Sequence, residues 1–257
     1  MPHDRLLLYG YRALTALQLS LLASATAVAA EPATARFAVI VSANAEWRVV
    51  KQRYPKATYL KSPYGEYFVD GGAVFVHGGW GKISAAGSAE WVISRFSPSL
   101  IVNLGTCGGF EGAIGRGEIV LANKTIVYDI VEQMGDPQEA INAYSTAIDL
   151  AWLRGPRPIP VRETTLVSAD RDILAGDVER LRKQYGAAAG DWESGAIAYV
   201  ARRNGVRVLI LRGVTDLVNP KGGEAYGNPD VFVRATQGVM TKLLDSLPAW
   251  LKLAAKP

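Results

Sequence analysis

Carboxylates lie directly after two strongly apolar segments of the chain. Glu46 follows the run at residues 36–42, and Asp216 follows the run at residues 206–214. A carboxylate at the carboxyl end of a buried strand is partly desolvated, which raises its pKa and suits it to general acid–base chemistry. Asp216 is equally suited to cap a helix or to close a turn. Arg212, inside the second run, either serves the same chemistry or forms a structural ion pair.

Two further acidic residues, Asp191 and Glu193, lie next to a segment of small residues at 192–203 that predicts a helix. A glycine-rich stretch at 105–110 follows a third apolar run, at 100–104. Glycine lets a backbone turn sharply or approach a ligand closely. The stretch therefore indicates either a ligand-binding loop beyond a strand end or a tight turn without a ligand.

Apolar periodicity and turn signals divide the chain into alternating strands and helices. Strands are predicted at 36–42, 57–76 (two or three strands), 74–77, 100–104, 117–122, 125–130, 164–168 and 206–214. Helices are predicted at 43–54, 83–96, 177–185, 192–203 and 230–247. Residues 135–162 are poorly patterned and predict a lid-like loop with one or two helical turns. This order favours an α/β fold with three layers, α/β/α, around a central mixed sheet.

Composition narrows the possible functions. The chain has 257 residues, 49% hydrophobic and 20% charged, which is enough for one packed α/β domain. The net charge is only +4 and no basic cluster is interleaved with aromatic residues, so we expect no nucleic-acid partner. Cys107 is the one cysteine, which excludes an intrachain disulfide. With only His3 and His77 as histidines, we expect neither a histidine-based metal site nor a Ser-His-Asp triad.

The N-terminus has the parts of a secretory signal peptide. Arg5 and Arg12 precede an apolar stretch at 13–28, which ends in small residues at 27–29 or, similarly, at 25–27. We expect residues 1–30 to be cleaved, leaving one domain at 31–257 that is exported, to the periplasm, without stable membrane insertion. The alternative is an uncleaved membrane anchor.

Five short motifs occur in one order: residues 43–46, 79–82, 103–109, 191–196 and 212–216. Together they resemble the purine nucleoside phosphorylase and uridine phosphorylase superfamily, and within it the 5′-methylthioadenosine/S-adenosylhomocysteine nucleosidases and their plant relatives. The likeness covers residues 36–250. It implies a hydrolase that cleaves the N-glycosidic bond of a purine nucleoside, uses no cofactor or metal, and forms a homodimer.

The resemblance also implies roles for individual residues. Asp216 matches the acid that protonates the leaving base near N7. Glu193 matches the glutamate that holds the ribose hydroxyls and stabilises the cationic transition state. Glu46 matches the glutamate that positions the attacking water, and Arg212 and Thr106 match the other groups around that water.

The remaining implied contacts involve the substrate's base and sugar. Thr215 matches the residue that orients the acid, and the glycines at 105–109, Gly108 among them, let the backbone pass close to the ligand. The main chain of Ile173 would recognise the purine edge. In this reading Cys107 is a small filler rather than a nucleophile.

Three aromatic residues make the 5′ specificity an open question. Trp192 stands where the nucleosidases usually have Met under the ribose, and Trp80 where a smaller aliphatic residue is common. For both tryptophans the alternative is simple core packing. Phe232 either lines the 5′ pocket or belongs to the core.

Two other functions remain possible from the sequence. A purine nucleoside phosphorylase would need a site for a dianion, and no obvious set of phosphate-binding arginines surrounds the glycines. An exported, non-catalytic nucleoside-binding protein would account for the signal peptide, but it would have no need of a proton donor beside the leaving base.

Overall fold

The computed structural model describes residues 34–255. The predicted signal peptide, residues 1–30, lies outside the described residues. In the part that is described, none of the helices combines the length and the apolar character that crossing a membrane requires.

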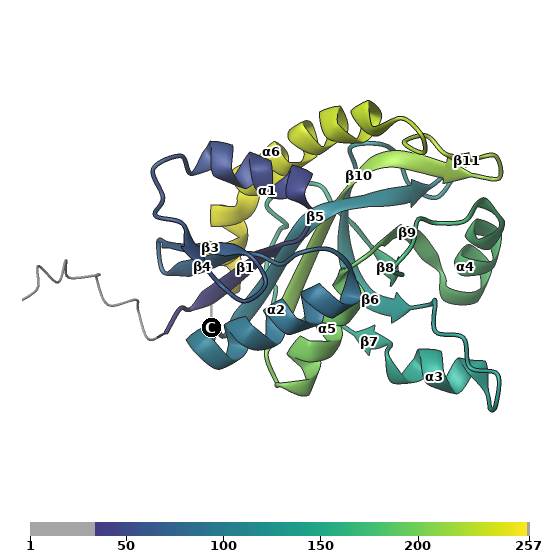
Figure 1. The fold of residues 1–257 in the computed structure, drawn as a ribbon, viewed down its shortest axis with the longest axis horizontal. Coiled ribbons are helices and arrows are strands. Elements are labelled where there is room, and N and C mark those ends of the chain that lie inside the picture. Colours follow the sequence, from purple (N-terminus) through teal and green to yellow (C-terminus); the bar gives the residue numbers. More distant parts are fainter. Residues whose placement is uncertain (1–33, 256–257) are drawn as a thin grey trace, which may run out of the picture. The chain divides into compact units, whose positions relative to one another are not determined.

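An eleven-stranded mixed sheet forms the centre of the fold (Figure 1). Its main path runs in the order β11-β10-β6-β8-β9-β5-β1-β4-β3-β2, with β7 paired to β6. The strands are β1 (Phe37–Val41), β2 (Leu60–Lys61), β3 (Glu66–Asp70), β4 (Ala73–His77), β5 (Leu100–Phe110), β6 (Ile119–Val127), β7 (Thr146–Ala147), β8 (Arg162–Ser168), β9 (Ala187–Asp191), β10 (Arg207–Asn219) and β11 (Gly222–Gly223).

Part of this sheet closes on itself. β10 pairs with both β5 and β6, and β6 connects through β8 and β9 back to β5, so five strands form a ring. From β5 the sheet continues through β1 as a parallel pair. Because β1, β5 and β10 are parallel neighbours, the residues towards their carboxyl ends lie together.

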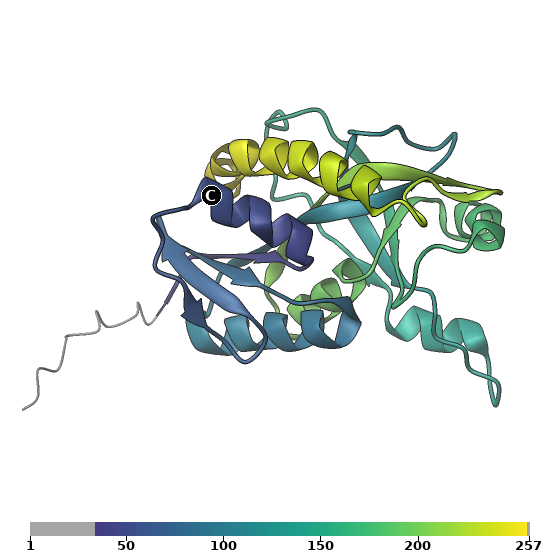
Figure 2. The same ribbon diagram turned by 45° about the horizontal axis from the view of Figure 1, so that its top comes forward.

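Helices cover the two faces of the sheet (Figure 2). One face carries α1 and α6, and the other carries α2 and α5, while α3, a short 3₁₀ helix (Ala175–Asp177) and α4 lie beside β6–β9 (Figure 1). The α-helices are α1 (Asn44–Arg53), α2 (Gly81–Phe96), α3 (Pro137–Ala143), α4 (Val178–Tyr185), α5 (Ser194–Arg203) and α6 (Pro229–Ala254). The three-layer α/β/α fold expected from the sequence is confirmed.

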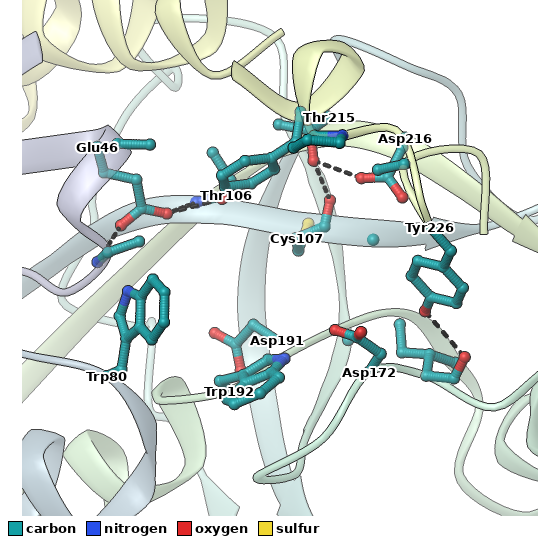
Figure 3. Close-up of a pocket in the computed structure, with 18 of the residues that line it drawn as sticks. Glu46, Trp80, Thr106, Cys107, Asp172, Asp191, Trp192, Thr215, Asp216 and Tyr226 are labelled. Atoms are coloured by element: carbon teal, nitrogen blue, oxygen red, sulfur yellow. Dashed lines mark hydrogen bonds between the residues drawn. The ribbon is translucent and has the colours of Figure 1, made fainter.

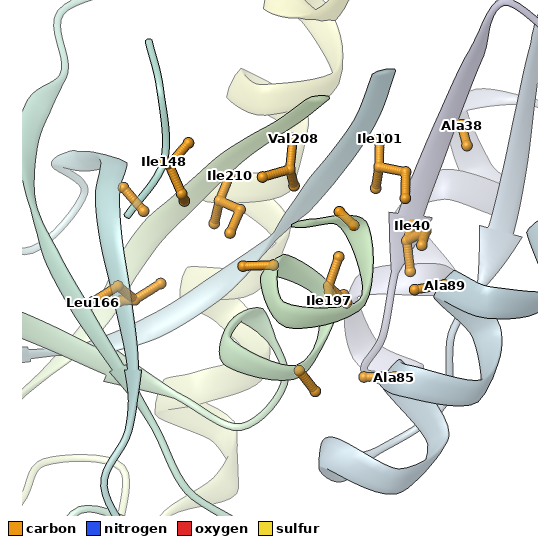
Figure 4. Packing of buried hydrophobic residues seen from close by; sticks show 14 of the residues in the cluster. Ala38, Ile40, Ala85, Ala89, Ile101, Ile148, Leu166, Ile197, Val208 and Ile210 are labelled. Carbon is orange, nitrogen blue, oxygen red and sulfur yellow. The ribbon is translucent and has the colours of Figure 1, made fainter. Parts of the chain in front are cut away.

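Two hydrophobic cores fill the space between the layers. All five residues of β1 are buried, and they alternate between the faces. Ala38 and Ile40 pack with α2 and α5 (Figure 4), whereas Val39 and Val41 pack with α1 and α6. Burial on both faces explains why the strand is continuously apolar.

The glycine-rich stretch at 105–110 is a strand, so the loop or turn expected there is wrong. β5 runs without interruption to Phe110. None of its glycines has a positive φ, but a Cβ on Gly105 would lie 2.2 Å from Arg212 Nη1, and one on Gly109 would lie 2.7 Å from Val214 Cγ1. These glycines allow close packing between strands rather than a turn.

Other strands also differ from those predicted from the sequence. β10 continues past residue 214 to Asn219, with one extra residue at Thr215. The strands expected at 117–122 and 125–130 form a single strand, β6. Strand β9, made almost wholly of alanine and glycine, was not predicted because small residues carry little strand signal.

Candidate active site

A cavity of about 440 Å³ opens where the carboxyl-terminal parts of β1, β5 and β10 meet (Figure 3). The structure brings ten of the eleven residues predicted from the sequence to its wall. They are Glu46, Trp80, Thr106, Gly108, Ile173, Trp192, Glu193, Thr215, Asp216 and Phe232. Arg212 is the exception: it is only 1% exposed and lies behind the wall.

Glu46 is fixed by hydrogen bonds from two elements. It occupies the first turn of α1, where its Oε2 accepts a hydrogen bond from the Ala43 N–H at 3.0 Å. Its Oε1 accepts two from Thr106 on β5, at 2.6 Å from the backbone nitrogen and 2.7 Å from Oγ1. The three donors hold this carboxylate in one orientation beside the cavity.

Arg212 is the counterion of the site. Its Nε lies 2.9 Å from Asp191 Oδ2, and its Nη2 and Nη1 lie 3.6 Å and 3.8 Å from carboxylate oxygens of Glu193 and Glu46. Nη2 also donates to Asn103 Oδ1 at 2.8 Å. Burial tends to lower the pKa of Arg212, but the surrounding carboxylates outweigh it and the pKa is raised. The guanidinium therefore stays charged and holds three acids in place.

Gly105 makes this arrangement possible. β5 and β10 pair in parallel with Arg212 beside Gly105, and the guanidinium lies where a larger residue would place its side chain. The strand pairing therefore places Arg212 beside residue 105, and the space that its guanidinium takes requires a glycine there.

The Glu193 carboxyl has a strongly raised pKa. Its Oε1 accepts a hydrogen bond from the Gly81 N–H at 3.2 Å, at the start of α2. Burial raises its pKa to about 8; the charge of Arg212 opposes this shift, and those of Asp191 and Glu46 add to it. In the ligand-free site this carboxyl is therefore mostly protonated at neutral pH, and a cationic group nearby would favour its ionised form.

Asp191 also lines the cavity, and its carboxylate is held by several polar partners. Its carboxylate accepts hydrogen bonds from Ser168 Oγ at 2.6 Å and from the hydroxyl of Ser194, besides its ion pair with Arg212. Its charge is thus satisfied from three directions. These hydrogen bonds and the ion pair provide the polar partners that a buried carboxylate needs.

A β-bulge presents Asp216 to the cavity. Val214 pairs with Cys107 and Asp216 with Gly108, so Thr215 is an extra residue in β10. Thr215 Oγ1 lies 2.7 Å from Asp216 Oδ1, to which it donates. Burial raises the pKa of Asp216, although the bonds from Thr215 and from the Ala225 N–H oppose the shift. Bulges commonly direct a side chain in this way beside active sites.

Aromatic side chains form one side of the cavity. Trp80, just before α2, is 65% exposed, so the alternative that it packs in the core is wrong. Trp192 and Phe232 are half-buried, line the cavity and belong to none of the three hydrophobic clusters among the described residues. The alternative that they are core residues is therefore also wrong. Figure 3 shows Trp80 and Trp192 on the side of the cavity away from Tyr226.

The cavity wall contains acidic but no basic side chains among the described residues. Five acids line it, and no lysine, arginine or histidine does. Lys82, near its rim, forms an ion pair with Asp129. Cys107 is buried and its pKa is raised well above the usual value, mainly by desolvation, so the thiol is not a nucleophile.

A family model described as the phosphorylase superfamily matches residues 36–247. The chain belongs to this superfamily. Within the superfamily it is similar to 5′-methylthioadenosine/S-adenosylhomocysteine nucleosidases. That of a Geobacillus species (strain WCH70) is 24% identical over 165 residues, which covers 60% of this chain and 71% of the relative. That of Halalkalibacterium halodurans is 28% identical over 176 residues, covering 62% and 73%.

Solved structures of the superfamily share the fold. The 5′-methylthioadenosine nucleosidase of Arabidopsis thaliana superimposes with a TM-score of 0.71 at 19% identity, and the match covers 87% of this chain and 98% of that structure. Identity at this level supports the common fold.

Sequence reasoning missed two residues of the cavity wall. Asp172 and Tyr226 lie in irregular segments that carry no periodicity, and neither belongs to a recognised motif. Tyr226 nevertheless donates a hydrogen bond from its hydroxyl to the backbone carbonyl of Ile173 at 2.8 Å. Ile173 and Tyr226 are 53 positions apart in the sequence, so only the folded chain brings them together.

Proposed function

We propose that the protein hydrolyses the N-glycosidic bond of a purine nucleoside, such as 5′-methylthioadenosine or S-adenosylhomocysteine, and releases adenine. The observation that carries this proposal is the convergence of Glu46, Glu193 and Asp216 on one cavity without a lysine or arginine in the part of its wall that is described. The names of the relatives support the same substrate class.

Asp216 is the proposed general acid. Its raised pKa lets it hold a proton closer to neutral pH than an exposed aspartate can. As the bond between C1′ and N9 breaks, Asp216 gives this proton to N7 of the purine, and the base leaves as a neutral molecule. Thr215 fixes the other carboxylate oxygen through its hydroxyl.

Glu46 is the proposed base for water. A water molecule held by Glu46 and Thr106 attacks C1′, its hydroxide part stays on the sugar, and its proton passes to Glu46. Arg212 contributes through the carboxylates and through its Nη1 bond to the Thr106 carbonyl at 3.3 Å, rather than by contact with the substrate.

Glu193 is the proposed ribose ligand. Its protonated form in the ligand-free site can donate to a ribose hydroxyl, and its ionised form stabilises the positive charge that develops on the sugar. Trp80, Trp192 and Phe232 provide an aromatic wall for the sugar and an apolar 5′ substituent.

Phosphorolysis is the second candidate, and the charges in the cavity argue against it. A phosphate dianion requires cationic side chains or a set of free backbone amides. Arg212 is fully buried and already pairs with three carboxylates.

One assay separates hydrolysis, phosphorolysis and binding alone. The protein lacking residues 1–30 is incubated with 5′-methylthioadenosine, adenosine and inosine, with and without phosphate, and free base and sugar products are measured. We expect adenine and unphosphorylated sugar at a rate independent of phosphate. A sugar 1-phosphate product would establish a phosphorylase, and binding without turnover would establish a binding protein.

Export to the periplasm and a homodimeric state remain predictions from the sequence. Export depends on residues 1–30, which lie outside the described residues. Fractionation of cells that express the full chain would test it, and sedimentation of the purified protein would test the dimer.

A further inference from the structure

A hydrogen bond connects two segments of the cavity wall. Tyr226 projects from the segment between β11 and α6, and its hydroxyl donates to the Ile173 carbonyl on the segment after β8 (Figure 3). This bond occupies one of the two lone pairs of the carbonyl oxygen and holds the phenol against it inside the cavity wall, where a ligand with a donor group would have to approach.

The segment that carries Tyr226 is anchored beside the proposed acid. The Ala225 N–H donates to Asp216, and the neighbouring Glu224 exchanges hydrogen bonds with the backbone of Leu217. Arg116 forms an ion pair with Glu224 and fastens the segment from outside. The backbone is thus held, and movement of Tyr226 is confined to its side chain.

The Ile173 side of this hydrogen bond is also held in place. Ile173 is 7% exposed, and its side chain packs over two glycines, Gly108 and Gly190, where a Cβ would lie only 3.1 Å and 3.0 Å away. Tyr226 itself is 41% exposed, so its hydroxyl can exchange the carbonyl for water at small cost.

The tyrosine can act only as a protonated phenol. Burial, and the nearby charges of Asp172 and Asp216, raise the pKa of Tyr226, so it keeps its proton throughout the neutral range. A ligand that takes over the carbonyl must therefore replace one donor by another.

We propose that Tyr226 weakens the preference of the cavity for amino-substituted purines by competing with the base for the Ile173 carbonyl. The proposal rests on the proposed function and on the role that the family resemblance implies for the main chain of Ile173, recognition of the purine edge. A purine with an exocyclic amino group replaces the phenol by its own N–H and loses no hydrogen bond. A purine without that group gains nothing from displacing Tyr226, and it leaves the carbonyl unpaired if the phenol moves away.

The test compares Tyr226→Phe with the wild-type enzyme. This variant keeps the ring and removes the competing hydroxyl. Calorimetry measures the binding of adenine and of unsubstituted purine, which lacks the amino donor. We expect the Kd for adenine to fall by about 2- to 10-fold, the worth of one net hydrogen bond, and the Kd for purine to stay or rise.

Two further variants keep the test independent of folding and ring position. Tyr185→Phe also loses a phenol hydrogen bond, to Gln138, but lies away from the cavity, and it should bind both bases as the wild type does. Gly223→Ala would place a Cβ 2.5 Å from Cε1 of Tyr226 and push the ring aside. It should shift the affinities in the same direction as Tyr226→Phe.

The outcomes separate this proposal from the proposed function. The role of Tyr226 would be overturned if Tyr226→Phe bound adenine no more tightly than the wild type, or if it did not bind adenine at all. An equal gain in affinity for both bases would overturn it too. Release of adenine from 5′-methylthioadenosine by the wild type is measured in parallel. Turnover without the selective gain would contradict only the role of Tyr226, whereas the gain without turnover would contradict only hydrolysis.

Discussion

Thr106 donates two hydrogen bonds to the same oxygen of Glu46, one from its backbone nitrogen and one from its hydroxyl. The pair joins β5 to the first turn of α1 at the point where the proposed water is activated. The backbone bond is insensitive to the side chain, whereas the hydroxyl bond can be removed by substitution.

Thr106→Val tests the hydroxyl with little change in shape. Because a buried carboxylate loses one of its donors, we expect kcat to fall by about 10- to 100-fold, with the KM for 5′-methylthioadenosine little changed. Steady-state kinetics measures both. Thr125→Val is the matched control, since the buried Thr125 hydroxyl has no hydrogen-bond partner and lies outside the cavity wall. Equal effects of the two substitutions would contradict the role of Thr106.

Asp216→Asn removes the proposed proton donor and keeps the size of the side chain. General-acid catalysis contributes about 10²- to 10⁴-fold, so we expect kcat to fall by that factor while substrate binding persists. Single-turnover release of adenine and calorimetric binding distinguish the two effects. Asp70→Asn, at the exposed end of β3, serves as control and should leave kcat within about twofold. An active Asp216→Asn enzyme would refute the assignment.

Glu193 gives the stability of the ligand-free protein a characteristic pH dependence. Its folded-state pKa of about 8 lies above the unfolded value, so its contribution to stability is complete below about pH 4.5 and is lost as the pH rises through 8. We expect Tm to decline over this range in the wild type and to decline less in Glu193→Gln. Comparing the two slopes removes the contributions of all other groups. Parallel slopes would mean that the Glu193 carboxyl titrates normally.

Gly105→Ala adds one methyl group at the closest approach of β5 to Arg212. Its Cβ would lie 2.2 Å from Arg212 Nη1 and 2.9 Å from Glu46 Oε1, so the buried ion-pair network must shift. We expect a loss of several kcal/mol in stability together with loss of turnover. Gly238→Ala on α6 has open space and should instead stabilise the protein by about 0.5–1 kcal/mol. Urea unfolding of both variants provides the comparison.

The sequence was sufficient for the architecture and for most of the cavity wall. Continuous apolar runs predicted β1 and the start of β10 because both lie between two helical layers. The motif order predicted which acids meet, since family motifs record contacts that the chain itself does not display. The glycines of β5 were misinterpreted because glycine is compatible with a turn and with close packing, and only the position of Arg212 decides between them.

Other features depend on long-range pairing. The bulge at Thr215 exists because β10 is matched against β5, and nothing local to residues 214–216 distinguishes it from a strand end. The bond between Tyr226 and Ile173 depends in the same way on where two irregular segments settle. Such segments carry no period from which a position could be predicted.

The absence of cationic side chains from the described cavity wall has a consequence for nucleotides. A nucleoside 5′-phosphate would bring about two negative charges into a space bordered by five acids, while the nearest guanidinium is buried behind them and already paired. The wall therefore acts as an electrostatic filter. A nucleoside that carries a 5′-phosphate would be disfavoured before recognition of the base begins.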